Sequence, residues 1–381
     1  MQFSNIIGQE KTKQHLVQTV VENRISHAQL FLGKEGSGSL ALALAYAQFI
    51  ACQDRQPADS CGQCASCRKY NKLIHPDLHF SYPFFAKHKD DTALSFITEW
   101  RTAFLKNPYL NLNEWRTQFD AENKQANINI AECHQIIQKL SLKPFESEYK
   151  ILIMWLPEYL DKEGNTLLKI IEEPAQKTVF ILVAENPDQL LTTLLSRTQL
   201  VKIAPLSDEE IKHYLMYTKG SSETQATQIA YLSEGNIQAA FHFLNEVEND
   251  QFSLFTSWMR MATGDKGSQI FDFVDQVAKM GRENQKHFLK YCINLIRECI
   301  LILCNVEQLT RLPSVELEFI TKFSNFITLG QAQAIINEIE KAHYHIERNA
   351  NPKILFLDVS LQFVSILKFN SLPHGTQYIS A

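Results

Sequence analysis

Short apolar runs alternate with helical patterns through the first 205 residues of the chain. A helical pattern with Leu16 and Val20 four residues apart precedes the apolar run 28–32, which predicts a buried strand. A glycine-rich loop and an alanine- and leucine-rich helix over 39–49 follow. Further buried strands are predicted over 150–155, 179–184 and 199–203. Strands that alternate with helices indicate an α/β fold, a parallel sheet flanked by helices.

Helical patterns alone fill the rest of the chain. Pro205 closes the α/β part, and Ser207-Asp208-Glu209-Glu210 has the spacing of a helix capping box. Glycine-containing breaks separate three helical segments up to about Glu248, and the patterns beyond Asp250 are helical throughout. We therefore predict three domains. They are an α/β domain over 1–205, a small helical lid over 206–248 and an all-α domain over 249–381.

The segment 78–128 has the least regular pattern. It is nevertheless rich in aromatic residues, which argues against simple disorder. These residues are Phe80, Tyr82, Phe84, Phe85, Phe96, Trp100, Tyr109 and Trp115.

Composition and charge narrow the class of protein. The chain is 45% hydrophobic and 21% charged, as is usual for a globular protein. A formal net charge of -5 argues against a surface that binds phosphate backbones over its whole extent, so direct DNA binding is not our first expectation. The most apolar stretch, 292–306, is interrupted by Arg297 and Glu298 and is shorter than the roughly 20 residues of a spanning helix. No secretory signal is visible, so we expect a cytoplasmic protein without membrane contact.

Four of the eight cysteines lie close together in the sequence. They are Cys52, Cys61, Cys64 and Cys67. Four thiolates at the spacing C-x8-C-x2-C-x2-C suit tetrahedral Zn2+, and four protein ligands leave no position for water. We predict a structural zinc site, with four free thiols as the alternative. The remaining cysteines, Cys133, Cys292, Cys299 and Cys304, are expected to be buried.

A glycine-rich loop stands where a phosphate-binding loop is expected, between the first strand and the next helix. Its glycines are Gly33, Gly36 and Gly38. A working loop also needs a lysine for the terminal phosphates and a serine or threonine for Mg2+. Aligned on the glycines, these two positions hold Ser39 and Leu40, and Lys34 lies elsewhere in the loop. We predict a degenerate, silent phosphate loop, and an ordinary tight turn is the alternative.

The strand over 150–155 lacks the acidic residues that hold Mg2+ in an ATPase. Trp155 and Leu156 stand at its end, and neither binds a metal. Glu158 is nearby, and we expect it to be an exposed surface residue. Hydrolysis of ATP by this chain is therefore not expected.

Ser196-Arg197-Thr198 lies at the predicted end of a helix, before the strand over 199–203. An arginine there can reach the nucleotide of a neighbouring subunit, the role of an arginine finger. A surface arginine or a structural ion pair is the alternative.

Together these segments resemble the delta-prime subunits of bacterial DNA polymerase III clamp loaders, within the AAA+ superfamily. The resemblance covers 1–77 and 129–245 well and the C-terminal helices only by class. The segment 78–128 departs from the family pattern, and we interpret it as an insertion of unknown role. The matching stretches are 3–10, 27–33, the four cysteines, His75-Pro76-Asp77, 165–174 and 190–198.

The resemblance implies an AAA+ module, a helical lid and an all-α collar domain that oligomerises. It implies that Arg197, with Ser196, enters the ATP site of a neighbouring subunit in trans, and that Thr198 replaces a cysteine of the family motif without changing the charge. Two nucleotide-sensing positions hold Ala184 and Gln238, which supply no charge to a γ-phosphate. The implied partners are gamma/tau-type ATPase subunits and a delta-type subunit, and through them the sliding clamp and primed DNA.

Two other functions stay open from the sequence. One is an active ATPase motor subunit of the same loader, and the other is a zinc-bearing scaffold outside replication. Weak binding of an adenine nucleotide at Gly8-Gln9 and the glycine loop also stays open.

Overall fold

The computed structural model describes residues 1–119, 125–245, 251–264, 269–310, 312 and 314–370. The chain divides into two compact units, each made of two stretches of sequence. The first comprises Met1–Ser221 and Ser233–Phe241, and the second comprises Ser222–Leu232 and His242–Ala381. The whole sheet belongs to the first unit.

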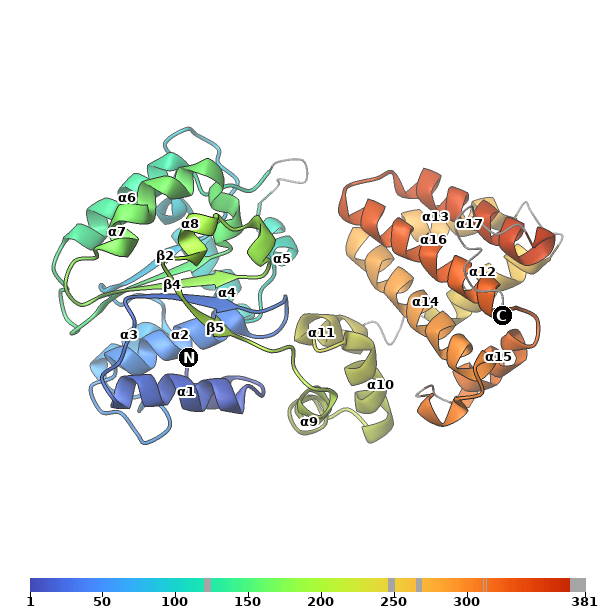
Figure 1. Ribbon diagram of the computed structural model, residues 1–381, viewed down its shortest axis with the longest axis horizontal. Helices are drawn as coiled ribbons and strands as arrows, with labels where there is room; N and C mark the ends of the chain where they lie inside the picture. The colour runs from blue at the N-terminus through green and yellow to red at the C-terminus, as the bar shows by residue number, and fades with distance from the viewer. Residues whose placement is uncertain (120–124, 246–250, 265–268, 311, 313, 371–381) are drawn as a thin grey trace. The chain divides into compact units, whose positions relative to one another are not determined.

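The sheet has five parallel strands in the order β2-β3-β4-β1-β5 (Figure 1). Every residue of β3 and β4 is buried, as in a parallel sheet covered on both faces. The four strands that the apolar runs predict are confirmed to within one residue at either end. The strands are β1 (Ala28–Leu32), β2 (Leu78–Ser81), β3 (Lys150–Trp155), β4 (Thr178–Ala184) and β5 (Gln199–Lys202).

The strand that the pattern did not predict is β2, at the edge of the sheet. Leu78 pairs with Ile151 and Ser81 with Met154, parallel to β3. The first four residues of the segment that we interpreted as an insertion are therefore part of the sheet. His79 interrupts the apolar run, and four residues are too few for a clear alternation.

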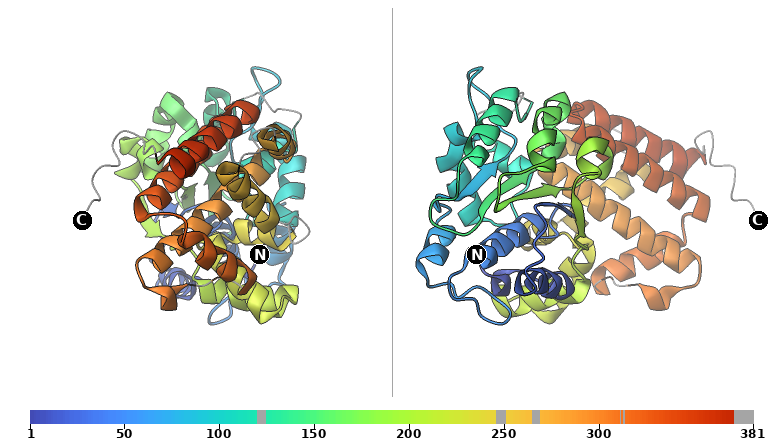
Figure 2. Two further views of the ribbon diagram at one scale, coloured as in Figure 1. Left: turned by 90° about the vertical axis from the view of Figure 1, so that its right-hand side faces the viewer. Right: turned by 60° about the vertical axis from the view of Figure 1, so that its left-hand side comes forward.

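Two hydrophobic clusters cover the two faces of the sheet. Phe31 and Ile153 point into one cluster and Leu30 and Leu152 into the other, because successive residues of a strand face opposite sides. The first cluster includes residues of α1 (Glu10–Val21), α2 (Ser39–Ala51) and α3 (Ala65–Asn71). The second includes residues of α6 (Ile130–Ser141), α7 (Leu168–Glu172) and α8 (Thr192–Leu195). The two groups of helices lie on opposite sides of the sheet in Figures 1 and 2.

The described part of the aromatic segment is folded into the first cluster. It forms α4 (Ile97–Lys106) and α5 (Leu112–Arg116). Trp100 is fully buried, stacks on Tyr82 at 4.1 Å between ring centroids and lies 5.3 Å from the ring of Trp155 on β3. Such ring pairs contribute about 0.5–1.5 kcal/mol beyond the burial of their area. The aromatic residues thus extend the core of the sheet, and the described part of the segment is folded, in line with the argument against simple disorder.

Helix α9 (Asp208–Lys219) begins with the predicted capping box. The Ser207 hydroxyl accepts a hydrogen bond from the Glu210 amide, and the Glu210 carboxylate accepts one from the Ser207 amide. Helices α10 (Glu223–Ser233) and α11 (Ile237–Asn245) follow. Most of α10 belongs to the second unit, whereas α9 and the start of α11 belong to the first. The division into three domains stays a proposal, and its boundary at 248 and 249 lies outside the described residues.

The described C-terminal part is all helical, as predicted. Trp258 is buried among the rings of Phe273, Phe288, Phe356 and Phe363. Its helices are α12 (Gln251–Thr263), α13 (Gln269–Ala278), α14 (Arg282–Leu303), α15 (Ser314–Ser324), α16 (Leu329–Glu347) and α17 (Pro352–Phe369). None of the described helices is both long enough and apolar enough to cross a bilayer.

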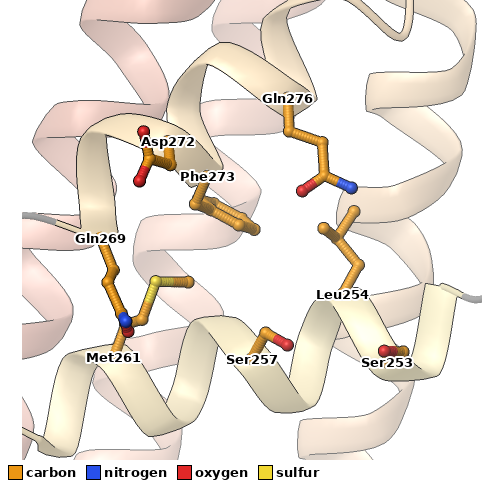
Figure 3. A pocket seen from close by; sticks show the side chains of 8 residues that line it. All are labelled: Ser253, Leu254, Ser257, Met261, Gln269, Asp272, Phe273 and Gln276. Carbon is orange, nitrogen blue, oxygen red and sulfur yellow. The ribbon is translucent and has the colours of Figure 1, made fainter.

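An open hollow of about 460 Å³ lies between α12 and α13 (Figure 3). Apolar and polar side chains line it together, including Leu254, Phe273 and Asp272. In the second unit, Cys292 and Cys299 of α14 are buried as expected. In the first unit, Cys133 of α6 is buried as well. Cys304 is exposed, contrary to the prediction, because it follows the last residue of α14 as its C-terminal cap.

Candidate functional site

The glycine loop lies between β1 and α2, as its sequence predicts. Gly36 and Gly38 adopt positive φ angles of 74° and 88°, the left-handed region that favours glycine. Ser39 is the first residue of α2, is 7% exposed and shares a 2.9 Å hydrogen bond with the Ser37 hydroxyl. Leu40 is buried in the core. The positions of the missing lysine and metal ligand therefore hold two buried side chains that supply neither a positive charge nor a free hydroxyl.

The space over the glycine loop is almost filled. It is bounded by the loop, by the ends of β3 and β4, and by residues 108–110. Its volume is about 20 Å³, enough for about one water molecule. Ligand pockets are usually on the order of 300–1,000 Å³. In this conformation the space is therefore too small for a nucleotide. The predicted phosphate-loop residues that line it are Gly33, Gly36, Gly38 and Ser39.

The strand ends beside this space carry no metal-binding pair. Trp155 and Leu156 are both buried in the first cluster. Glu158 is half-buried rather than exposed, so our expectation for it was wrong. Its carboxylate accepts hydrogen bonds from the amides of Glu185 and Asn186, at 2.6 and 2.9 Å, just after β4. Burial raises the pKa of Glu158.

Glu185 lines the same space and has an unusual carboxyl group. Burial, followed by the charges of Glu35 and Glu158, raises its pKa to about 8. The carboxyl group that lines the space therefore stays protonated near neutral pH, and the nearby charges of Glu35 and Glu158 contribute to this.

The raised pKa of Glu185 predicts a pH-dependent stability. The folded state holds the proton up to about pH 8, and the unfolded state releases it near the ordinary glutamate pKa. The free energy of unfolding is therefore expected to fall as the pH rises through this window. Glu185→Gln should remove this fall and stabilise the chain at pH 8 by on the order of 1–2 kcal/mol, with little change near pH 4.5. Urea unfolding at the two pH values tests this, and equal effects at both would contradict it.

The two sensor positions also lack charge in the structure. Ala184 is buried at the end of β4. Gln238 is buried at the start of α11, and its amide donates a 2.7 Å hydrogen bond to the Glu114 carboxylate. Glu114 and Tyr109 had no assigned role from the sequence, because their partners lie more than 100 residues away.

The four clustered cysteines come together in space. Their Sγ atoms all lie within 4.8 Å of one another, close to the roughly 3.8 Å between sulfurs that a tetrahedral site with about 2.3 Å zinc–sulfur bonds requires. Backbone amides of Cys61, Cys64 and Cys67 each donate to the sulfur of the preceding cysteine of the set, at 3.3 to 3.4 Å. Such donors stabilise thiolates. The cluster is able to hold a metal ion.

The cysteine cluster is tied to the N-terminal turn of the chain. The Asp59 carboxylate accepts hydrogen bonds from the Phe3 and Ser4 amides, both at 2.9 Å. Gln2 and Gln48 donate to Ser60, which precedes Cys61. Loss of the cluster would therefore loosen more than its own loop.

Arg197 lies just after α8 and is about one third exposed. Its guanidinium forms a 3.0 Å ion pair with Glu172 and donates to the Thr193 carbonyl at 3.1 Å. The Ser196 hydroxyl donates to the same carbonyl, at 3.1 Å. The structure thus brings together two of the stretches that carry the family resemblance, 165–174 and 190–198.

Asp77, which the sequence singled out only through the resemblance, organises a loop. Its buried carboxylate accepts hydrogen bonds from the amides of Phe145, Glu146 and Ser147, at 2.6 to 2.8 Å. Burial opposes the charge of Asp77, yet these three donors outweigh it and lower the pKa of the carboxyl. The residue is thus structural.

Known proteins that resemble this chain include several DNA polymerase III subunits. The chain is 27% identical over 209 residues to the subunit delta' of Bacillus subtilis, covering 55% of this chain and 51% of that protein. It is 24% identical over 258 residues to the subunit gamma of Buchnera aphidicola, covering 65% of this chain and 59% of that one. The chain thus spans about half the length of the curated relatives it matches.

A solved structure, the Bacillus subtilis DNA clamp loader delta protein, aligns over 93% of this chain and 99% of its own, with 13% identity and a TM-score of 0.33. Residues 8–207, more than half of the chain, match the family described as DNA polymerase III, delta subunit. The chain, with its parallel sheet flanked by helices and its helical C-terminal part, therefore belongs to the DNA polymerase III delta subunit family.

Proposed function

We propose that this chain is a delta-prime-type subunit of a DNA polymerase III clamp loader. In this role it hydrolyses no ATP itself. It supplies Arg197, with Ser196 beside it, to the ATP site of a neighbouring gamma/tau-type subunit, and it helps to load the sliding clamp on primed DNA in the cytoplasm. A delta-type subunit is a further partner. The four clustered cysteines hold a structural Zn2+.

One observation carries the proposal. The space over the glycine loop measures about 20 Å³, its phosphate-binding lysine position holds Ser39, and the end of β3 carries no acidic pair, whereas Arg197 is partly exposed at a helix end. A chain that lost its own ATP chemistry and kept an arginine for a neighbour has this combination. The relatives named delta' and gamma support a place among clamp-loader subunits.

The second candidate is an ATPase motor subunit of the same loader. The relatives named gamma and tau favour it. It requires the space over the glycine loop to open and Lys34, which is exposed, to reach the phosphates. The buried positions of Ser39, Leu40 and Trp155 argue against it.

Reconstitution separates the two candidates. The purified chain alone, with Mg2+ and ATP, is expected to show no turnover above background. Added to gamma/tau-type and delta-type subunits, it is expected to complete an assembly that loads the clamp on primed DNA. Turnover by the isolated chain would favour the motor subunit, and failure to join the assembly would contradict a role in the loader.

A further inference from the structure

The short segment Asn107–Glu114 lies between the glycine loop and the start of α11, all within the first compact unit. Tyr109 is 9% exposed, and its hydroxyl accepts a 2.8 Å hydrogen bond from the Ile7 amide. A Cβ atom added to Gly38 would lie 3.0 Å from the Tyr109 ring. Because Gly38 has no side chain, the Tyr109 ring can pack directly against the loop.

Polar contacts join the same segment to both sides of the space. The Glu35 carboxylate, in the glycine loop, accepts hydrogen bonds from the Asn111 amide at 3.1 Å and from the Asn236 amide at 3.4 Å. The Glu114 carboxylate accepts the 2.7 Å hydrogen bond from Gln238. The Asn107 amide donates to the same Glu114 carboxylate, at 2.8 Å.

The loop and α11 also touch directly. The Ile237 amide donates to the Gly36 carbonyl at 3.3 Å, and a Cβ atom on Gly36 would overlap the Asn236 side chain. Tyr109 further packs against Phe241 of α11, with 6.4 Å between ring centroids. Loop, segment and the start of α11 therefore form one packed assembly.

These contacts involve the positions at which an ATPase with this kind of loop would bind its nucleotide. Gln238 stands at the position where the family resemblance puts a phosphate-sensing arginine, and its partner here is the Glu114 carboxylate. Glu35 and the glycines belong to the loop that would surround phosphates. Tyr109 accepts its hydrogen bond from Ile7, next to Gly8-Gln9, where we left a weak adenine site open.

We propose that Asn107–Glu114 is a built-in substitute for nucleotide. It occupies the space over the glycine loop and holds the loop and the start of α11 together, whether or not ATP is present. The segment that departs from the family pattern thereby has a role, which is to keep this subunit in one conformation. The inference concerns this chain alone and does not depend on Arg197.

Hydrogen–deuterium exchange of the full chain tests the proposal. The variant Glu35→Ala/Gln238→Met removes the three side-chain hydrogen bonds from the loop side and the α11 side, and it leaves Asn107–Glu114 unchanged. Exchange over 33–38 and 233–241 is expected to rise about tenfold or more, because hydrogen bonds to charged groups are lost. Peptides of β3 and β4 are expected to stay as in the wild type. Glu209→Ala, at an exposed glutamate of α9, is the matched control and should change neither region.

Millimolar Mg-ATP provides the second arm. It is expected to leave the exchange of the wild-type chain unchanged at both peptides, because the space is already occupied. Slower exchange with ATP in the wild type would overturn the proposal, and so would wild-type exchange rates in the double variant. If exchange in β3 and β4 also rises in the double variant, the single variant Gln238→Met is measured instead. Its exchange over 33–38 and 233–241 then supports or overturns the proposal by the same criteria. The exchange experiment uses the chain alone, whereas the proposed function is tested in the reconstituted loader. A failure of one is therefore distinguishable from a failure of the other.

Discussion

Replacing Arg197 by alanine is expected to lower the ATP turnover of the assembled clamp loader by about 10³-fold or more at each site that the residue serves. An arginine supplied in trans neutralises charge on the transferring phosphoryl group and is worth factors of roughly 10³ to 10⁵ in other NTPases. Turnover is to be measured with primed DNA and clamp, on complexes matched for subunit content. If other sites of the loader keep turning over, single-turnover measurement isolates the affected one.

The proposed finger role requires Arg197 to leave its partners within this chain. Its guanidinium rests on Glu172 and on the Thr193 carbonyl, and the ion pair is partly exposed on both sides. Exposed ion pairs contribute only about 0.2–1 kcal/mol, so leaving Glu172 for a neighbour's phosphate costs little. Glu172 thus holds the side chain near the surface through an ion pair that costs little to break.

Two variants sharpen the result for Arg197. Arg197→Lys keeps the charge and loses the planar fork, so it is expected to recover only part of the turnover. Arg24→Ala removes an exposed arginine from the loop after α1 and is the matched control, with turnover like the wild type. An Arg197→Ala complex that assembles and turns over at the wild-type rate would contradict the finger.

The strands in the middle of the sheet could be predicted because both of their faces are buried. β3 and β4 therefore contain unbroken apolar runs, such as 151–155. β2 could not be predicted, because an edge strand of four residues with His79 inside it gives no clear period. The capping box at Ser207 was predictable because its two partners are three residues apart.

In the candidate site, too, only the features formed by neighbouring residues in the sequence could be predicted. The glycine loop and its missing lysine are local features, visible in consecutive residues 33–40. The contacts around the space are not local, since Tyr109, which lines it, and Glu114 meet partners more than 100 residues away in sequence. Glu158 was misread for a related reason. Its neighbours in sequence suggest a surface turn, but its carboxylate caps the amides that follow β4.

The variant Cys64→Ser is expected to lower the free energy of unfolding of the chain by about 3–5 kcal/mol when Zn2+ is bound. Structural zinc contributes its binding free energy to folding, and a hydroxyl is a poor replacement for a thiolate ligand. Metal analysis of the purified wild-type chain is expected to find one zinc ion per chain. A chelator should lower the wild-type melting temperature and leave that of the variant nearly unchanged.

Cys64 is a sharp choice because its side chain has a second role that serine keeps. It is the N-cap of α3, and its sulfur accepts a hydrogen bond from the Cys67 amide. Serine is among the best N-cap residues, so the substitution should preserve or improve the helix start. A loss of stability is then attributable to the metal ligand and not to the helix.

The matched control is Cys133→Ser, which should leave the zinc content unchanged. Cys133 is a buried cysteine outside the cluster, and its sulfur donates to the Glu163 carbonyl. A wild-type chain without zinc, together with a Cys64→Ser chain as stable as the wild type, would mean that the four thiols serve no metal.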